Sequence, residues 1–221
     1  MDRVRNALQA APIVLWLSCV VPCLAQSSPD AATRQAARTL ATSVCERCHG
    51  AEGRSADPAV PAIAGQRESY IESQLKAFRA QNRREPDAHM YMSGIRYYST
   101  DQINTGNVSD SAGLLSDEII TGLASYFSSQ TPASGKPGDP ALVATGKQLY
   151  EKGSPDRGIP ACAGCHGANA EGFSTVPRLA GQHAQYLVSQ MQMLRVPAMH
   201  GAVRNLSDKE MASVAAYLQS K

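Results

Sequence analysis

The sequence predicts an all-α protein made of two tandem domains related by internal duplication. Several segments carry apolar residues at helical spacing, and no segment shows the alternating apolar and polar pattern of a β-strand. The second half of the chain also repeats motifs of the first half, at an offset of 116 or 117 residues over most of the repeat and of 91 at the last matching pair. Because a fixed offset indicates duplicated structural units, the repeat takes precedence over other fold signals.

The repeat defines the domain boundaries. Three pairs of stretches match: residues 45–49 with 162–166, 61–66 with 177–182, and 115–118 with 206–209. Residues 131–140, which separate the halves, contain three prolines and two glycines and are typical of a linker. We therefore predict an N-terminal domain at 26–130, a linker at 131–140 and a C-terminal domain at 141–221.

The helices are expected in the same order in each half. Four of them are predicted at residues 31–44, 66–80, 141–152 and 182–194. The last helix of each half is expected to begin at Ser116 or Ser207. Serine is a favoured helix N-cap, and acidic residues follow each of these serines in the first turn.

Residues 1–25 have the pattern of a secretory signal peptide. Arg3 and Arg5 provide a positively charged start, an apolar stretch follows, and small residues precede position 26. The apolar stretch is shorter than the ~20 residues that a membrane-spanning helix needs. We expect export to the periplasm, with an uncleaved membrane anchor as the alternative.

The cysteines form two identical motifs. Cleavage after residue 25 would remove two of the six cysteines, and the other four lie in two C-x-x-C-H pentapeptides. This is the attachment signature of a c-type haem, in which two thiols form thioethers and the histidine binds the iron. We expect two covalently attached haem c groups and no disulfides. The attachment residues are Cys45, Cys48, Cys162 and Cys165, and the proximal iron ligands are His49 and His166.

Two prolines are candidates to orient these histidines. A ligating histidine usually donates its second ring N–H to a backbone carbonyl or a carboxylate. Pro61 and Pro177 follow the two haem motifs in matching contexts, so their carbonyls are the expected acceptors. Simple turn prolines are the alternative interpretation.

The sixth iron ligand decides what such a haem can do. Methionine gives a six-coordinate iron of raised potential suited to electron transfer, whereas an open position would allow substrate chemistry. In the C-terminal half, Met199 lies in a loop after the predicted helix at 182–194 and is the expected ligand. Met191 and Met193 lie on that helix and are more typical of packing residues.

The N-terminal half offers Met90 and Met92. Met92 is preferred because Met92-Ser-Gly-Ile and Met199-His-Gly-Ala share the same spacing. However, 23 residues separate Met92 from Leu115, against 7 between Met199 and Leu206. The extra residues near 96–113 are either a docking loop for a partner or a tolerated surface loop. His89, His183 and His200 are alternative ligands, although such histidines are more often surface or loop residues.

Charge and composition exclude some functions. The chain carries 21 basic and 19 acidic residues, and no basic stripe with interleaved aromatic residues suggests nucleic-acid binding. Only three phenylalanines and one tryptophan are present. Such domains would have small protein cores, and a buried haem in each would supply much of the missing apolar volume.

Together these motifs resemble the class I dihaem cytochromes c, most closely the cytochrome c4 family. The resemblance rests on both C-x-x-C-H-G motifs, both Pro-x-x-Ala-Gly-Gln stretches, the methionine loops and the Leu-Ser-Asp helices. It implies two His/Met haem domains packed as a pseudo-twofold pair in a periplasmic or membrane-associated electron carrier.

The function expected from the sequence is therefore electron transfer rather than catalysis. The partners would be redox proteins, a donor and an acceptor, such as a membrane oxidase or a dehydrogenase. Two alternatives remain at this point. One is a dihaem oxidoreductase with one open haem, and the other is an electron-accepting subunit of a larger dehydrogenase or oxidase complex.

Overall fold

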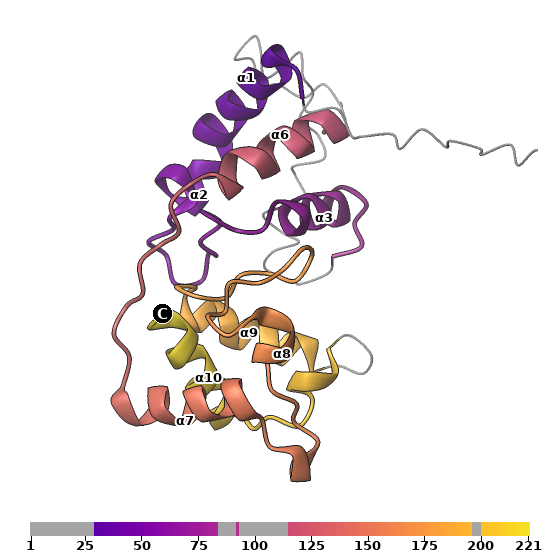
Figure 1. The fold of residues 1–221 in the computed structure, drawn as a ribbon. Coiled ribbons are helices and arrows are strands. Elements are labelled where there is room, and N and C mark those ends of the chain that lie inside the picture. The colour runs from indigo at the N-terminus through magenta and orange to yellow at the C-terminus, as the bar shows by residue number, and fades with distance from the viewer. Residues whose placement is uncertain (1–28, 84–91, 93–114, 196–199) are drawn as a thin grey trace, which may run out of the picture.

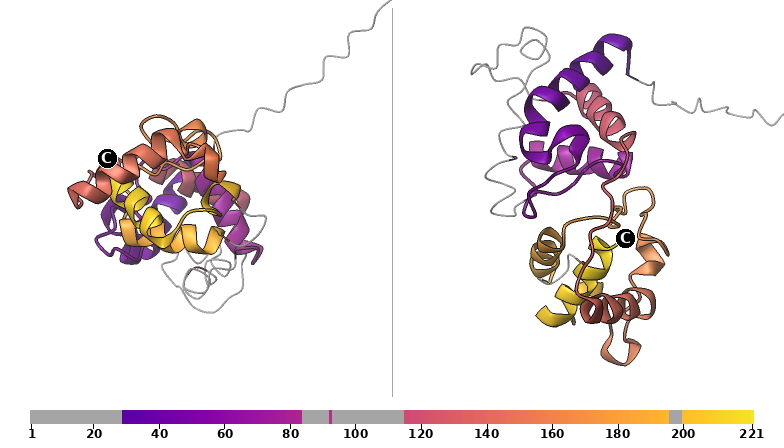
Figure 2. Two further views of the ribbon diagram at one scale, coloured as in Figure 1. Left: turned by 90° about the horizontal axis from the view of Figure 1, so that it is seen from below. Right: turned by 90° about the vertical axis from the view of Figure 1, so that its left-hand side faces the viewer.

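The computed structural model describes residues 29–83, 92, 115–195 and 200–221. These residues are helical and contain no β-strand, only isolated bridges between Ser154 and Ile159 and between Phe173 and Val176. The helices form two groups, one from each half of the chain, joined by a single extended segment (Figure 1). A view turned about the vertical axis shows the same two groups (Figure 2). The all-α, two-domain fold class is confirmed.

Several predictions concern residues outside the described ranges. These are the signal peptide at 1–25, His89, Met90, the insert at 96–113 and Met199. In the described part of the chain, no helix has the length and apolar character needed to cross a membrane.

In its described residues, the N-terminal domain contains three longer helices and a short one at the end of the first haem motif. Its elements are α1 (Ala31–Leu40), η1 (Ala41–Cys45), α2 (Glu46–His49), η2 (Ala51–Gly53), α3 (Glu68–Arg79) and α6 (Asp117–Ser128). Asp30 caps α1, accepting a 2.7 Å hydrogen bond from the Thr33 N–H. The helix predicted at 31–44 is interrupted, because its last turn widens into the π-turn η1.

The C-terminal domain repeats this arrangement. Its elements are α7 (Pro140–Lys152), η4 (Pro155–Arg157), α8 (Ala163–His166), α9 (Ala184–Leu194), η5 (Gly201–Val203) and α10 (Asp208–Gln219). The predicted caps are confirmed, since the Ser116 and Ser207 hydroxyls accept hydrogen bonds from the Ile119 and Glu210 N–H groups. Ser207 and Glu210 form a reciprocal capping box.

Each domain has its own core, built where small residues let helices approach closely. In the N-terminal domain, a Cβ atom added to Gly122 of α6 would lie 2.7 Å from Ala37 of α1. In the C-terminal domain, a Cβ atom on Gly146 of α7 would lie 1.9 Å from the Ser213 carbonyl oxygen of α10. Tyr150 and Met211 are fully buried there. The domains therefore meet as two separately packed units.

Both haem motifs end in a glycine with left-handed backbone geometry. The φ angle is 75° at Gly50 and 84° at Gly167, a region that side-chain-bearing residues rarely adopt. These glycines end α2 and α8 directly after the two histidines. The chain then turns back, which brings the Pro61 and Pro177 loops beneath the histidine rings.

Candidate haem sites and the interface between the domains

His49 and His166 are buried and oriented by proline carbonyls. The Nδ1 atom of His49 lies 2.9 Å from the Pro61 carbonyl oxygen, and that of His166 lies 3.0 Å from the Pro177 carbonyl oxygen. These are the contacts that the sequence led us to expect. When Nδ1 donates to a carbonyl, the lone pair lies on Nε2, which is then the nitrogen that can bind iron.

Burial keeps both imidazoles in the form that binds iron. Desolvation lowers the pKa of His49 and of His166, and the proline carbonyl opposes this effect only in part. Each ring is therefore neutral at physiological pH, as a metal-binding imidazole must be.

The four cysteines of the motifs differ in exposure. Cys48 and Cys165 are exposed, whereas Cys45 and Cys162 are half-buried, and all four are free in this structure. Burial raises the pKa of the Cys45 thiol to about 12 and raises the pKa of Cys162 in the same direction. Such thiols are uncharged and weakly nucleophilic in the folded chain.

Met92 packs in the same region as the first motif. It is partly buried against the core cluster formed by α1, α3 and α6, and Cys45 and Ile63 are partly buried against that cluster too. The alternative Met90 lies outside the described residues.

Two tyrosine hydroxyls, whose hydrogen bonds the sequence did not predict, hold the motifs in place. Tyr126 donates a 2.9 Å hydrogen bond to the Glu46 carboxylate, which also accepts from the Glu52 N–H at 2.9 Å. The buried Tyr150 donates a 2.6 Å hydrogen bond to the Gly167 carbonyl, one residue after His166. Desolvation raises the pKa of both tyrosines, so both remain protonated donors.

The two domains are joined by a reciprocal pair of glutamines. The side-chain amide of Gln66 accepts a 2.7 Å hydrogen bond from the Arg178 N–H and donates a 2.9 Å hydrogen bond to the Arg178 carbonyl. The Gln182 amide bonds both the N–H and the carbonyl of Ala62, at 3.0 and 2.9 Å. Gln182 follows Gln66 by 116 residues, and Arg178 follows Ala62 by the same number. Equivalent residues of the two halves therefore make equivalent contacts, as in the isologous interface of a symmetric dimer.

A second pair of contacts obeys the same symmetry. The Arg67 Nε donates to the Glu171 carbonyl at 2.8 Å, and the buried His183 Nε2 lies 2.9 Å from the Ser55 carbonyl oxygen. His183 follows Arg67 by the same 116 residues, and each of these two side chains contacts a backbone carbonyl of the other domain. His183 is thus an interface residue in this structure. These contacts also explain why α3 and α9 begin two residues later than predicted, because Arg67 and His183 have extended backbones.

The linker crosses both Ala-Gly-Gln stretches. A Cβ atom on Gly65 would lie 2.3 Å from the Pro132 ring, and one on Gly181 would lie 2.5 Å from the Ala133 carbonyl oxygen. Beyond this point, the Lys136 N–H donates to the Gln219 carbonyl at 2.8 Å. The two residues of the repeated Gly-Gln pair therefore have separate roles. The glycine leaves room for the linker to pass closely, and the glutamine forms hydrogen bonds with the other domain.

A half-buried arginine at this interface suits a carboxylate ligand. The Arg178 Nε is buried and has no hydrogen-bond partner among the described residues. Burial lowers the pKa of Arg178, and the nearby positive charge of Arg67 acts in the same direction. A guanidinium in this state is complementary to a carboxylate, and the propionates of a haem are carboxylates. The donor set and this unpaired group both fit haem c.

His200 lies next to the second proximal histidine. Its ring centroid is 6.2 Å from that of His166, with 20° between the ring planes, and its Nδ1 is buried without a partner among the described residues.

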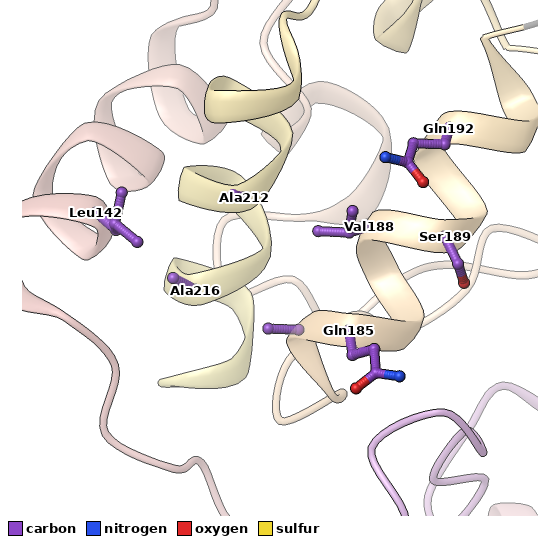
Figure 3. Close-up of a pocket in the computed structure, with 8 residues that line it drawn as sticks. Leu142, Gln185, Val188, Ser189, Gln192, Ala212 and Ala216 are labelled. Atoms are coloured by element: carbon purple, nitrogen blue, oxygen red, sulfur yellow. The ribbon is translucent and has the colours of Figure 1, made fainter.

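An open apolar hollow of about 460 Å³ lies elsewhere, between α9, α10 and α7, and is lined by residues such as Val188 and Ala212 (Figure 3). None of the candidate iron ligands lines this hollow.

The comparisons with known proteins agree with this arrangement. The model of the Cytochrome c family matches the chain twice, over residues 35–131 and 143–221. The chain belongs to the cytochrome c family.

Relatives within this family are cytochromes c4. Cytochrome c4 of Azotobacter vinelandii is 34% identical over 96% of the chain and 99% of its own length. The solved cytochrome c4 of Acidithiobacillus ferrooxidans superposes with a TM-score of 0.66 at 32% identity, covering 80% of this chain and 98% of that one. The resemblance to cytochrome c4 is confirmed, and so is the expectation of two covalently bound haem c groups.

Another group of relatives is connected with thiosulfate dehydrogenases. A "thiosulfate dehydrogenase electron acceptor" of Thiomonas intermedia is 31% identical over 80% of the chain and 78% of its own length. The thiosulfate dehydrogenase TsdBA of Marichromatium purpuratum superposes with a TM-score of 0.66 at 25% identity, covering 85% of this chain and 40% of that one.

Proposed function

We propose that this dihaem cytochrome carries electrons in the periplasm between redox protein partners, with both irons bound by histidine and methionine. The proposal rests chiefly on the reciprocal interface. Two buried histidines, each oriented by a proline carbonyl, belong to domains that Gln66 and Gln182 hold in one fixed relation. A fixed separation between two haems suits electron transfer between them.

The protein contributes ligands, burial and orientation. Haem c supplies the redox chemistry, an iron that cycles between the ferric and ferrous states. Cys45, Cys48, Cys162 and Cys165 hold the two groups, and His49 and His166 bind the irons from one side. The Pro61 and Pro177 carbonyls keep both imidazoles in one orientation, so little of the chain has to move when the charge changes.

Met92 and Met199 are the proposed sixth ligands. Support for Met92 comes from its position against the core that Cys45 also contacts. Support for Met199 comes from the sequence alone, in its repeat-equivalent position. Methionine ligation raises the potential of a haem and closes it to small molecules, which favours a carrier over an enzyme.

We further propose that residues 1–25 direct export and are removed, and that the donor or acceptor is a membrane oxidase or a dehydrogenase. A second candidate role is that of a dedicated electron acceptor in a sulfur-oxidising complex. It is favoured by the relatives named as thiosulfate dehydrogenase electron acceptors. An oxidoreductase activity of the chain itself would require one haem with an open sixth position.

The experiment is to produce the exported protein with a haem-maturation system and to measure haem per chain, ferric spectra and carbon monoxide binding. Two covalent, low-spin haems that do not bind carbon monoxide support the carrier. A high-spin or carbon monoxide-binding haem contradicts it and points to an enzyme. Reduction by a thiosulfate dehydrogenase, compared with reduction by a quinol-dependent donor, separates the two carrier roles.

A further inference from the structure

The arginines at the domain interface do not follow the symmetry of the repeat. Arg178 stands where the first half has Ala62, and Arg67 stands where the second half has His183. Burial lowers the pKa of Arg178, and the positive charge of Arg67 acts in the same direction, so the two guanidinium groups lie near each other. One side of the interface therefore carries two arginines, and the equivalent side carries an alanine and a histidine.

The Arg178 guanidinium has no partner in the described part of the chain. Gln66 bonds the Arg178 backbone, but the side chain forms no hydrogen bond or ion pair among the described residues, and its Nε is buried. Arg195 provides a contrast. Its Nε is also buried without a partner, yet its Nη2 donates a 2.6 Å hydrogen bond to the Asp208 carboxylate. Arg178 is thus a half-buried cation that lacks an anion, an arrangement that costs free energy until an anion binds.

The carboxylate of Glu171, which lies in the same region, is engaged elsewhere. It accepts a 2.8 Å hydrogen bond from the Asn169 N–H, within the loop that follows the second haem motif. The Glu171 backbone carbonyl is also engaged, because it accepts the 2.8 Å hydrogen bond from the Arg67 Nε. The positive charge of Arg178 is therefore left for an anion that the described residues do not supply.

The place of Arg178 in the chain indicates which haem supplies this anion. Arg178 directly follows Pro177, whose carbonyl oxygen lies 3.0 Å from the Nδ1 atom of His166. The C-terminal haem would be bound through this same histidine, and its propionates are carboxylates. A guanidinium can bond a carboxylate through two parallel N–H groups, so the unpaired Nε of Arg178 suits such a partner.

We infer that Arg178 binds a propionate of the C-terminal haem, and that Arg67 adds a second positive charge beside this carboxylate. The inference rests on the proposed function, which places a haem c in each domain. A positive charge near a haem favours the ferrous state, which has one positive charge fewer than the ferric state. Arg178 therefore raises the midpoint potential of the C-terminal haem, whereas the N-terminal haem has only Ala62 at the equivalent position.

The test measures both midpoint potentials of the full holoprotein by optical redox titration. Arg178→Gln removes the charge but keeps the backbone N–H and carbonyl that bind Gln66, so the interface is retained. At a fixed applied potential, the ferric-to-ferrous ratio of the C-terminal haem should rise about tenfold, which is a fall of about 59 mV in its midpoint potential. The other haem should keep its potential.

Two further variants make the assignment specific. Arg178→Lys keeps the charge and should retain most of the potential, although lysine cannot form the paired hydrogen bonds of a guanidinium. Lys152→Gln is the matched control, because it removes one positive charge from an exposed position on α7 in the same domain. It should leave both potentials unchanged.

Two spectroscopic measurements identify the haem and its carboxylate. Proton NMR assigns the shifted haem through the contacts of its thioether bridges with Cys162 and Cys165. Infrared difference spectra of protein with isotope-labelled propionate carboxyls report on the carboxylate itself. The labelled carboxylate band should shift in Arg178→Gln and in Arg178→Lys, but not in Lys152→Gln.

The inference is overturned if Arg178→Gln changes neither potential by more than Lys152→Gln does, or if only the N-terminal haem responds. Both results leave two haems per chain and the proposed function standing. Fewer than two covalent haems in the wild type would contradict the proposed function and this inference together. If Arg178→Gln does not fold, the infrared spectrum of Arg178→Lys decides, because an unchanged carboxylate band there also overturns the inference.

Discussion

Replacing Gln66 by alanine should weaken the contact between the domains by a predictable amount. The side chain takes part in three hydrogen bonds, two with the Arg178 backbone and one from the Arg67 N–H at 2.8 Å. It is only 8% exposed, so its partners would lose their bonds in a largely buried setting. At about 1 kcal/mol for each bond, with some compensation by water, Gln66→Ala should cost about 2–4 kcal/mol.

The measurement is guanidinium unfolding of the oxidised holoprotein, followed by haem absorbance and by far-ultraviolet circular dichroism. Gln182→Ala removes the equivalent three bonds and should give a similar loss. Gln192→Ala is the matched control, because this glutamine is exposed on α9 and should change stability by less than about 0.5 kcal/mol.

The double variant Gln66→Ala/Gln182→Ala tests whether the two glutamines act on one interface. Once the domains have separated, the second substitution has little left to break, so the combined loss should be smaller than the sum. A Gln66→Ala effect no larger than that of Gln192→Ala would refute the reasoning. So would strictly additive losses.

Three further predictions concern the C-terminal domain. Tyr150→Phe leaves the Gly167 carbonyl without its 2.6 Å partner and should cost about 1–3 kcal/mol in guanidinium unfolding, with a spectral change confined to one haem. An unchanged spectrum would mean that this hydroxyl does not position the motif. Gly146→Ala places a Cβ atom 1.9 Å from the Ser213 carbonyl oxygen, and the forced separation of α7 from α10 should cost about 1–3 kcal/mol in thermal unfolding. A hydrogen bond from Arg157, together with those from Ser207, lowers the pKa of Glu210 from an ordinary value of 4.5 to about 2. Because the folded-state pKa is depressed, the stability difference between the wild type and Glu210→Gln should be complete above about pH 5 and should shrink as the pH falls from 4.5 towards 2. A difference that stays constant over this range would contradict the assignment.

The features that follow from local sequence were predictable. The spacing within each C-x-x-C-H motif is set by the porphyrin. Ser116 and Ser207 cap helices by accepting hydrogen bonds from residues only three positions further along the chain. The fold class followed from helical periodicity and from the repeat. These signals need no knowledge of how the domains meet.

The roles of the interface residues could not be predicted in this way. Gln66 and Gln182 were visible as a repeated motif, but their partners lie 112 and 120 residues away in the chain. The roles of the tyrosines were not predictable either. Tyr126 on α6 is repeated as Tyr217 on α10, but the repeat does not indicate its acceptor, Glu46, which lies 80 residues away in the chain. Tyr150 lies on α7, and its acceptor, Gly167, lies 17 residues away.

The reciprocal interface has a consequence for the origin of the molecule. A surface that pairs with its own equivalent is the kind that joins two copies of one subunit, so the chain has the architecture of a homodimer whose subunits were fused. Identical subunits must carry the same substitutions. Fusion removes that constraint, and the interface shows the result, with Arg67 in one half where His183 stands in the other. The same freedom lets one chain surround its two haem-binding motifs with different residues.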